Sequence, residues 1–346
     1  MKRLILLFAI IKLLSMPVWG LELTAPTVPS SVQRNMPDSS NTLGEGLVEI
    51  IKNAVEELAP DLEDAASVCL CIGCCGILVS LIQHIPGSTP WAVEIAGVSG
   101  ISLLFMDTSG ALIRLASDTV NQTYEYAKLY FPVLSAALAA QGGVSSSVAL
   151  YSGTMIFNVS LSALISKVLI PAVYLFLALA ISAGIADQDI LNKILEAMKS
   201  LITWMLKLVL YGFTGYMSIT GVITGNADSS ALKITKMAIS SMVPVVGGIL
   251  SNASETVVIS AAMTRNAAGI YGLFAFLTIC IGPAFRIGVH YLMLKITEGI
   301  ISVFANKKVV ALMGHFSTAM GLLFAMTCTV CVLLLVSTAC FMRGVG

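Results

Sequence analysis

The sequence predicts an all-α, polytopic helical membrane protein with about seven or eight transmembrane helices, including one broken or re-entrant segment. Of its 346 residues, 57% are apolar and only 11% are charged, whereas about 25% of the residues in an ordinary soluble domain are charged. The mean hydropathy is +0.92. So few charges cannot cover the surface of a soluble protein of this length, and we therefore expect a lipid bilayer around most of the chain.

The first 64 residues are expected to lie outside the membrane domain. Residues 1–20 have the pattern of a signal peptide, with a charged start, a short apolar run and Gly20 as a small residue for cleavage. An uncleaved first anchor is the alternative. Residues 21–64 contain nine acidic and two basic residues. They predict an acidic extracytoplasmic linker followed, from Leu43, by an amphipathic helix that ends or kinks at Pro60.

Residues 65–346 are predicted to form the polytopic transmembrane domain. A polar turn at 86–90, the stretch Asp107–Gly110 and the pair Lys167 and Pro171 are expected to separate its helices. A mixed-charge amphipathic piece is expected at 187–199. The apolar runs in chain order are 65–85, 91–106, 131–140, 144–166, 168–185, 201–224, 237–263, 267–283, 287–304 and 311–340, some of them too short for a span on their own.

Several charged residues fall inside or between these apolar runs. Within 111–130, Arg114 and Asp118 stand four residues apart, and polar positions alternate with apolar ones, which predicts an interfacial or cavity-lining helix. Charged side chains are costly in lipid and usually face a polar cavity. The residues proposed to line such a cavity are Glu94, Arg114, Asp118, Glu255, Arg286 and His290. For Arg286 and His290, a pair at a helix end in the interface is the alternative.

The usual chemical motifs are absent from the sequence. It has no P-loop, no H-E-x-x-H and no G-x-S-x-G, and it has only three histidines. Cys69, Cys71, Cys74 and Cys75 could suggest a metal or redox site, but they lie in an apolar run without a histidine nearby, so packing is the preferred interpretation. The 19 basic and 19 acidic residues cancel, which argues against nucleic-acid binding. We expect no catalytic residue, metal or cofactor.

Glycines and a proline dominate residues 211–258. Gly221 and Gly225 form a G-x-x-x-G pattern, which allows close approach of helix backbones in a membrane. Pro244 would interrupt a helix and release backbone groups that must be satisfied inside protein or beside water; a plain kinked helix is the alternative. The complete set of expected packing residues is Gly212, Gly215, Gly221, Gly225, Pro244, Gly247 and Gly248.

The same region closely resembles the stage III sporulation protein AE family. The matching stretches are 220–228, which begins Thr-Gly-Val-Ile-Thr-Gly, the helix around 233–236, and 239–251, which reads Ile-Ser-Ser-Met-Val-Pro-Val-Val-Gly-Gly-Ile-Leu-Ser. The resemblance implies a multi-pass protein of the mother-cell membrane around the forespore. It also implies a secretion-like channel complex with other membrane subunits of the stage III sporulation complex, needed for endospore formation and forespore support. It supplies no catalytic residue.

Two classes of function remain open at this point. The first is a non-enzymatic subunit of a transport or channel assembly. The second is a stand-alone secondary transporter of a small molecule, in which Glu94, Asp107, Arg114, Glu255 and Arg286 would bind substrate or coupling ions. Inverted repeats would favour the transporter, and no convincing repeat is found.

Overall fold

The computed structural model describes residues 36–37, 43–85, 89–186, 189–242 and 247–343, with side chains described except at 43–44, 220–267 and 343. The described residues are helical almost throughout and include no strand, so the all-α class is confirmed. The elements are α3 (Leu43–Glu56), α4 (Leu58–Gln83), α5 (Pro90–Ala140), α6 (Val144–Leu164), the π-helical turn η1 (Ile165–Leu169), α7 (Ile170–Ile185), α8 (Asp189–Met242), α9 (Gly247–Ile301) and α10 (Lys307–Arg343).

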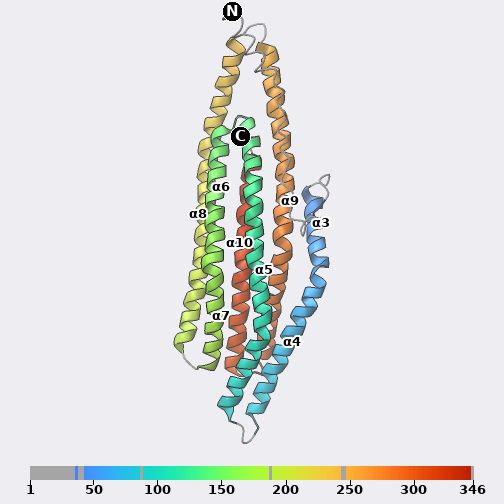
Figure 1. Ribbon diagram of the computed structural model, residues 1–346, viewed down its shortest axis with the longest axis vertical. Helices are drawn as coiled ribbons and strands as arrows, with labels where there is room; N and C mark the ends of the chain where they lie inside the picture. The colour runs from blue at the N-terminus through green and yellow to red at the C-terminus, as the bar shows by residue number, and fades with distance from the viewer. Residues whose placement is uncertain (1–35, 38–42, 86–88, 187–188, 243–246, 344–346) are drawn as a thin grey trace, which may run out of the picture.

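The long helices form an elongated bundle around α10 (Figure 1). Helix α10 packs against α5, α6, α7, α8 and α9, which explains why it carries apolar residues on nearly all of its faces. Helices α3 and α4 lie along α9, and α4 also packs on α5. Helices α8 and α9 project beyond the ends of the other helices in Figure 1.

Five helical segments of the described chain are long and apolar enough to cross a membrane. They are Leu58–Gln83, Pro90–Ala140, Val144–Ile185, Ala268–Ile301 and Lys307–Met342. The expected number of seven or eight spans is therefore not confirmed. Part of the difference arises because runs that the sequence separates are continuous helices: 91–106 and 131–140 both belong to α5, and 267–283 continues into 287–301 within α9. The expected runs 201–224 and 237–263 reach into residues 220–267, whose side chains lie outside those described.

The predicted break at Asp107–Gly110 is wrong, because α5 continues through it. The polar side chains here find partners within the helix: the Ser109 hydroxyl donates to the carbonyl of Met106 at 3.0 Å, and that of Thr119 to the carbonyl of Leu115 at 2.7 Å. Unfavourable helix propensity costs only about 0.5–1 kcal/mol per residue. Burial of Phe105 and Leu112, which share the buried face of α5 with Ser109, outweighs it.

The predicted separation at Lys167 and Pro171 is also wrong. Helix α6 passes through the π-helical turn η1 into α7, and Pro171 lies at the start of α7. A π-helical turn shifts the hydrogen-bond register by one residue, so a proline can be accommodated without ending the rod. Likewise residues 189–199 of the amphipathic piece expected at 187–199 are the beginning of the long helix α8.

Aromatic side chains fill the interface between α5, α9 and α10. Phe276 of α9 packs edge-on against Tyr126 and Tyr130 of α5, with ring centroids 5.1 and 5.4 Å apart, and Phe131 stacks on Phe341 of α10 at 5.6 Å. The Tyr130 hydroxyl donates to the carbonyl of Ala268 at 3.0 Å. This cluster fixes the position of α9 relative to α5, on which the candidate site depends.

The cysteines of α4 point in different directions. Cys69 is buried, whereas Cys71 and Cys74 are exposed and Cys75 is half-buried. Within the described part of the chain, no three side chains of the types that bind metals lie close enough to share an ion.

Candidate functional site

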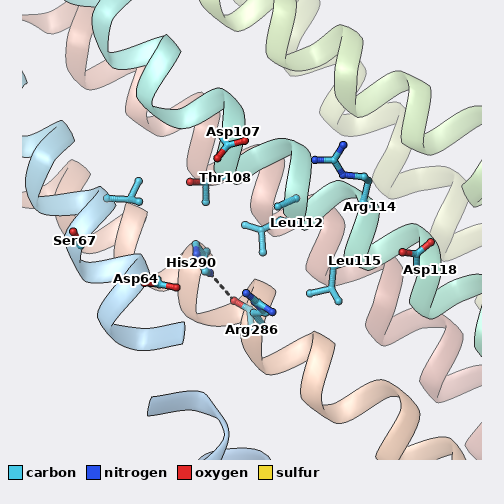
Figure 2. Close-up of a pocket in the computed structure, with 12 residues that line it drawn as sticks. Asp64, Ser67, Asp107, Thr108, Leu112, Arg114, Leu115, Asp118, Arg286 and His290 are labelled. Carbon is cyan, nitrogen blue, oxygen red and sulfur yellow. Dashed lines mark hydrogen bonds between the residues drawn. The ribbon is translucent and has the colours of Figure 1, made fainter. Parts of the chain in front are cut away.

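A polar cleft of about 600 Å³ opens between α4, α5 and α9. Figure 2 shows charged side chains from all three helices around it. The polar residues that line the cleft are Asp64, Ser67, Asp107, Thr108, Arg114, Asp118, Arg286 and His290, and apolar contacts come from Val68, Ala111, Leu112 and Leu115.

One wall of the cleft is held by an ion pair between distant parts of the sequence. The Arg286 Nε lies 3.0 Å from Asp61 Oδ1, so α9 is tied to the first turn of α4. The side chain of Asp61 is 19% exposed and that of Arg286 is 48% exposed. One turn further along α9, His290 is buried, and its Nδ1 lies 2.9 Å from the carbonyl oxygen of Arg286, as the dashed line in Figure 2 shows.

The other wall is a single face of α5. Asp107, Arg114 and Asp118 are seven and four residues apart, so they share one side of the helix. All three are exposed, and their side chains extend from α5 in Figure 2. The opposite side of α5 is buried against the bundle. The arrangement therefore provides charges of both signs around a space that a solute can enter, without any nucleophile and base joined by a hydrogen bond.

Four of the six residues predicted to line a polar cavity meet here: Arg114, Asp118, Arg286 and His290. Asp64 and Ser67 also line the cleft, although sequence reasoning placed Asp64 in the exported segment. Asp61 and Asp64 stand one turn apart just before an apolar run, and this spacing is the signal that could have identified the two aspartates as site residues. The side chain of Glu255 lies outside those that the structure describes.

Glu94 belongs to a separate polar cluster at the connection between α9 and α10. Its Oε2 accepts from Lys308 Nζ at 2.8 Å, and its Oε1 accepts from the amide of Asn306. Asn306 also donates its backbone N–H to Ser80 Oγ at 2.9 Å and its side-chain amide to Gln83 Oε1 at 3.3 Å. Glu94 therefore joins the start of α5 to the end of α4 and to the start of α10, away from the cleft.

We expect Glu94→Gln to lower the free energy of unfolding by about 1.5–3 kcal/mol, the range for hydrogen bonds to a charged group. The side chains of Glu94 and Lys308 are only 16% and 21% exposed, so water replaces little of the lost interaction. Thermal denaturation of the purified protein in detergent measures the change. The matched control is Glu56→Gln, whose carboxylate is 66% exposed and whose partner Lys52 is 72% exposed, so that its loss should stay below about 0.5 kcal/mol. Equal losses would contradict the assignment.

The glycines expected to mediate packing have different surroundings. A Cβ at Gly212 would lie 3.6 Å from the ring of Phe157, an ordinary contact, and one at Gly215 would meet no atom within 4 Å. Gly221 and Gly225 lie in α8, and Gly247 and Gly248 begin α9, but the surroundings of these four are outside the described side chains. Pro244 lies outside the described residues.

The fold and the cleft together define a class: a helical bundle with several candidate membrane spans and an open polar cleft. The family model described as stage III sporulation protein AE matches residues 35–344. The chain therefore belongs to the stage III sporulation protein AE family, as the motifs at 220–251 predict, and this membership supports a role in sporulation.

A curated relative gives the same result. The chain is 22% identical over 224 residues to a protein of Bacillus subtilis (strain 168) named "Stage III sporulation protein AE". The match covers 64% of this chain and 56% of that protein, so it spans little more than half of the relative. No solved structure matches the chain.

Proposed function

We propose that this protein is a non-enzymatic, multi-pass membrane subunit of a sporulation channel or secretion-like complex that links mother cell and forespore. The observation that carries the proposal is the family match over residues 35–344. The five candidate spans support a place in the membrane. The proposed location is the mother-cell membrane around the forespore, and the proposed partners are other membrane subunits of the stage III complex.

The features of the cleft agree with a role in an assembly. It holds charges of both signs at a junction of three helices, and Arg286 contributes to the structure by pairing with Asp61. Such a site can accommodate water and small solutes, but it lacks an arrangement that would activate a nucleophile.

The same cleft favours a second candidate, a stand-alone secondary transporter. In this alternative Asp107, Arg114 and Arg286 would bind a substrate or coupling ion in the cleft. Glu94 fits it less well, because its carboxylate is engaged by Lys308 and Asn306.

Two measurements test the proposal. Cells that lack the chain should fail to form heat-resistant spores, and the full-length chain supplied in trans should restore them; a normal spore count without the chain would contradict the proposal. The purified chain in liposomes should not take up labelled amino acids, sugars or inorganic ions along an imposed proton or sodium gradient. Gradient-driven uptake by the isolated chain would instead support the transporter.

A further inference from the structure

A continuous polar stripe runs along the exposed face of α5. Its positions alternate at spacings of four and three residues, which keeps them on one side of a helix. All are exposed, and all but the alanine are polar: Asp107, Ala111, Arg114, Asp118, Asn121, Glu125 and Lys128. At 1.5 Å per residue the stripe is about 32 Å long, close to the roughly 30 Å thickness of the hydrocarbon core of a bilayer.

The neighbouring helices expose apolar residues at the same depth. The Ser135 hydroxyl of α5 donates to the carbonyl of Ser147 of α6, which aligns the two antiparallel helices. By this alignment Ile156 lies near the depth of Glu125, and Leu175 of α7 near that of Asp107. Ile156 is 64% exposed and Leu175 is 55% exposed. Between residues 144 and 185 the sequence has a single charged residue, Lys167.

The contrast between the charged face of α5 and the apolar surfaces of α6 and α7 argues that lipid does not contact the stripe. The surface of α6 and α7 is suited to lipid, whereas a charged group at the bilayer centre costs about 2.5–3.5 kcal/mol on the most moderate scale. The stripe carries five charged groups, of which Arg114 and Asp118 lie nearest its middle and Asp107 and Lys128 lie at its two ends. The pair between Glu125 and Lys128, 3.0 Å apart, leaves the two central charges uncompensated. The total would approach the 5–15 kcal/mol by which an entire folded domain is stable.

The cleft widens the polar surface along the part of the stripe from Asp107 to Asp118. Across from these residues stand Asp64 of α4 and Arg286 and His290 of α9 (Figure 2). In Figure 1, α5 lies in front of α10 and between α6 and α9, so among the residues that the structure describes no helix covers its outer face. The polar surface is therefore open to whatever surrounds the protein on this side.

We propose that the polar stripe of α5, together with the cleft, lines a water-filled path across the membrane for small hydrophilic solutes. Alternating Asp, Arg, Glu and Lys side chains hold water along the whole length and give neither anions nor cations a strongly preferred route. This inference deepens the proposed function and rests on it for one point, that the path belongs to the sporulation complex.

Cysteine labelling tests the path in the full-length protein, in membranes of sporulating cells. Single substitutions Asp107→Cys, Asp118→Cys, Asn121→Cys and Glu125→Cys are treated with a charged, membrane-impermeant thiosulfonate reagent, and the modified peptides are quantified by mass spectrometry. The controls are Ile156→Cys and Leu175→Cys, which are exposed at matching depths on an apolar surface. The unsubstituted chain gives the background from native cysteines.

The path predicts that all four stripe positions react at least about tenfold faster than the two controls, because the reactive thiolate forms only in contact with water. Reaction at Asp107→Cys and Glu125→Cys without Asp118→Cys and Asn121→Cys would overturn a continuous path. Equal rates at stripe and control positions would also overturn it.

A second pair of variants keeps the test decisive if a cysteine variant fails to accumulate. Asp118→Asn keeps a polar side chain, whereas Asp118→Leu is suited to lipid. The path predicts normal accumulation of both and fewer spores for Asp118→Leu than for Asp118→Asn; higher accumulation of Asp118→Leu with normal spores would place the stripe in lipid. If the stripe positions do not react but the cells need the chain to sporulate, the path is refuted and the proposed function stands. If the stripe positions react but cells without the chain sporulate normally, the proposed function is refuted and the path stands.

Discussion

Gly272→Ala should strongly destabilise the protein, although alanine is the better helix former. A Cβ at Gly272 of α9 would overlap the ring and hydroxyl of Tyr130. Tyr130 is fully buried and hydrogen-bonded to the carbonyl of Ala268, so its ring cannot rotate away. Overpacking of this kind costs about 1–3 kcal/mol, and we expect the upper end. The loss is measured by thermal denaturation in detergent and by the amount of protein in membranes.

The matched control for this substitution is Gly299→Ala on the same helix. A Cβ there would meet no atom within 4 Å, so only the gain in helix propensity, at most about 1 kcal/mol, should appear. Tyr130→Leu removes the overlapping atoms, and the double variant Gly272→Ala, Tyr130→Leu should lose less stability than the sum of the single changes. Additive losses would show that the close approach of α9 to α5 is not the cause.

Phe276→Ala should cost about 3–5 kcal/mol of unfolding free energy, the range for removing a buried aromatic ring. Phe276 has no exposed surface and contacts Tyr126, Tyr130 and Phe131. Its loss leaves a cavity at the interface that holds α9 against α5. We therefore also expect the helices around the cleft to pack less tightly, which is measured as faster proteolysis of the α4–α5 region in detergent.

Phe304→Ala provides the comparison for the aromatic substitution. Phe304 follows α9 and is 63% exposed, so its removal should change stability by less than about 0.5 kcal/mol. If both phenylalanine variants unfold at the same temperature, the aromatic cluster does not stabilise the bundle as described.

The class of the fold could be predicted because the excess of apolar residues extends along most of the chain. A chain in lipid satisfies its backbone either as helices or as a closed barrel, and long continuous apolar runs with few charges favour helices. The ends of the helices were less predictable, since local signals compete with packing. Asp107 to Gly110 looks like a helix stop, but Phe105 and Leu112 pack into the bundle from the same helix and hold it continuous.

The kinds of residue in the candidate site were predictable, but which residues meet there was not. Arg114 and Asp118 could be placed on one face of a helix from their spacing. Nothing in the sequence shows that Asp61 meets Arg286, because that contact depends on how α4 lies along α9. Because helix contacts cannot be read from the sequence, Glu94 is predicted to line the cavity, whereas tertiary packing places it beside Lys308 and Asn306.

The proposed role of this chain is that of a subunit assembled with other membrane proteins of the sporulating cell. The most direct measurement is native isolation of the tagged, full-length chain from sporulating-cell membranes in mild detergent, after crosslinking in intact cells, with the crosslinked residues identified by mass spectrometry. We expect a large complex that contains other stage III sporulation proteins, with crosslinks between them and this chain. A chain that is recovered alone, at the size of a monomer in detergent and without crosslinks to any other stage III protein, would contradict it.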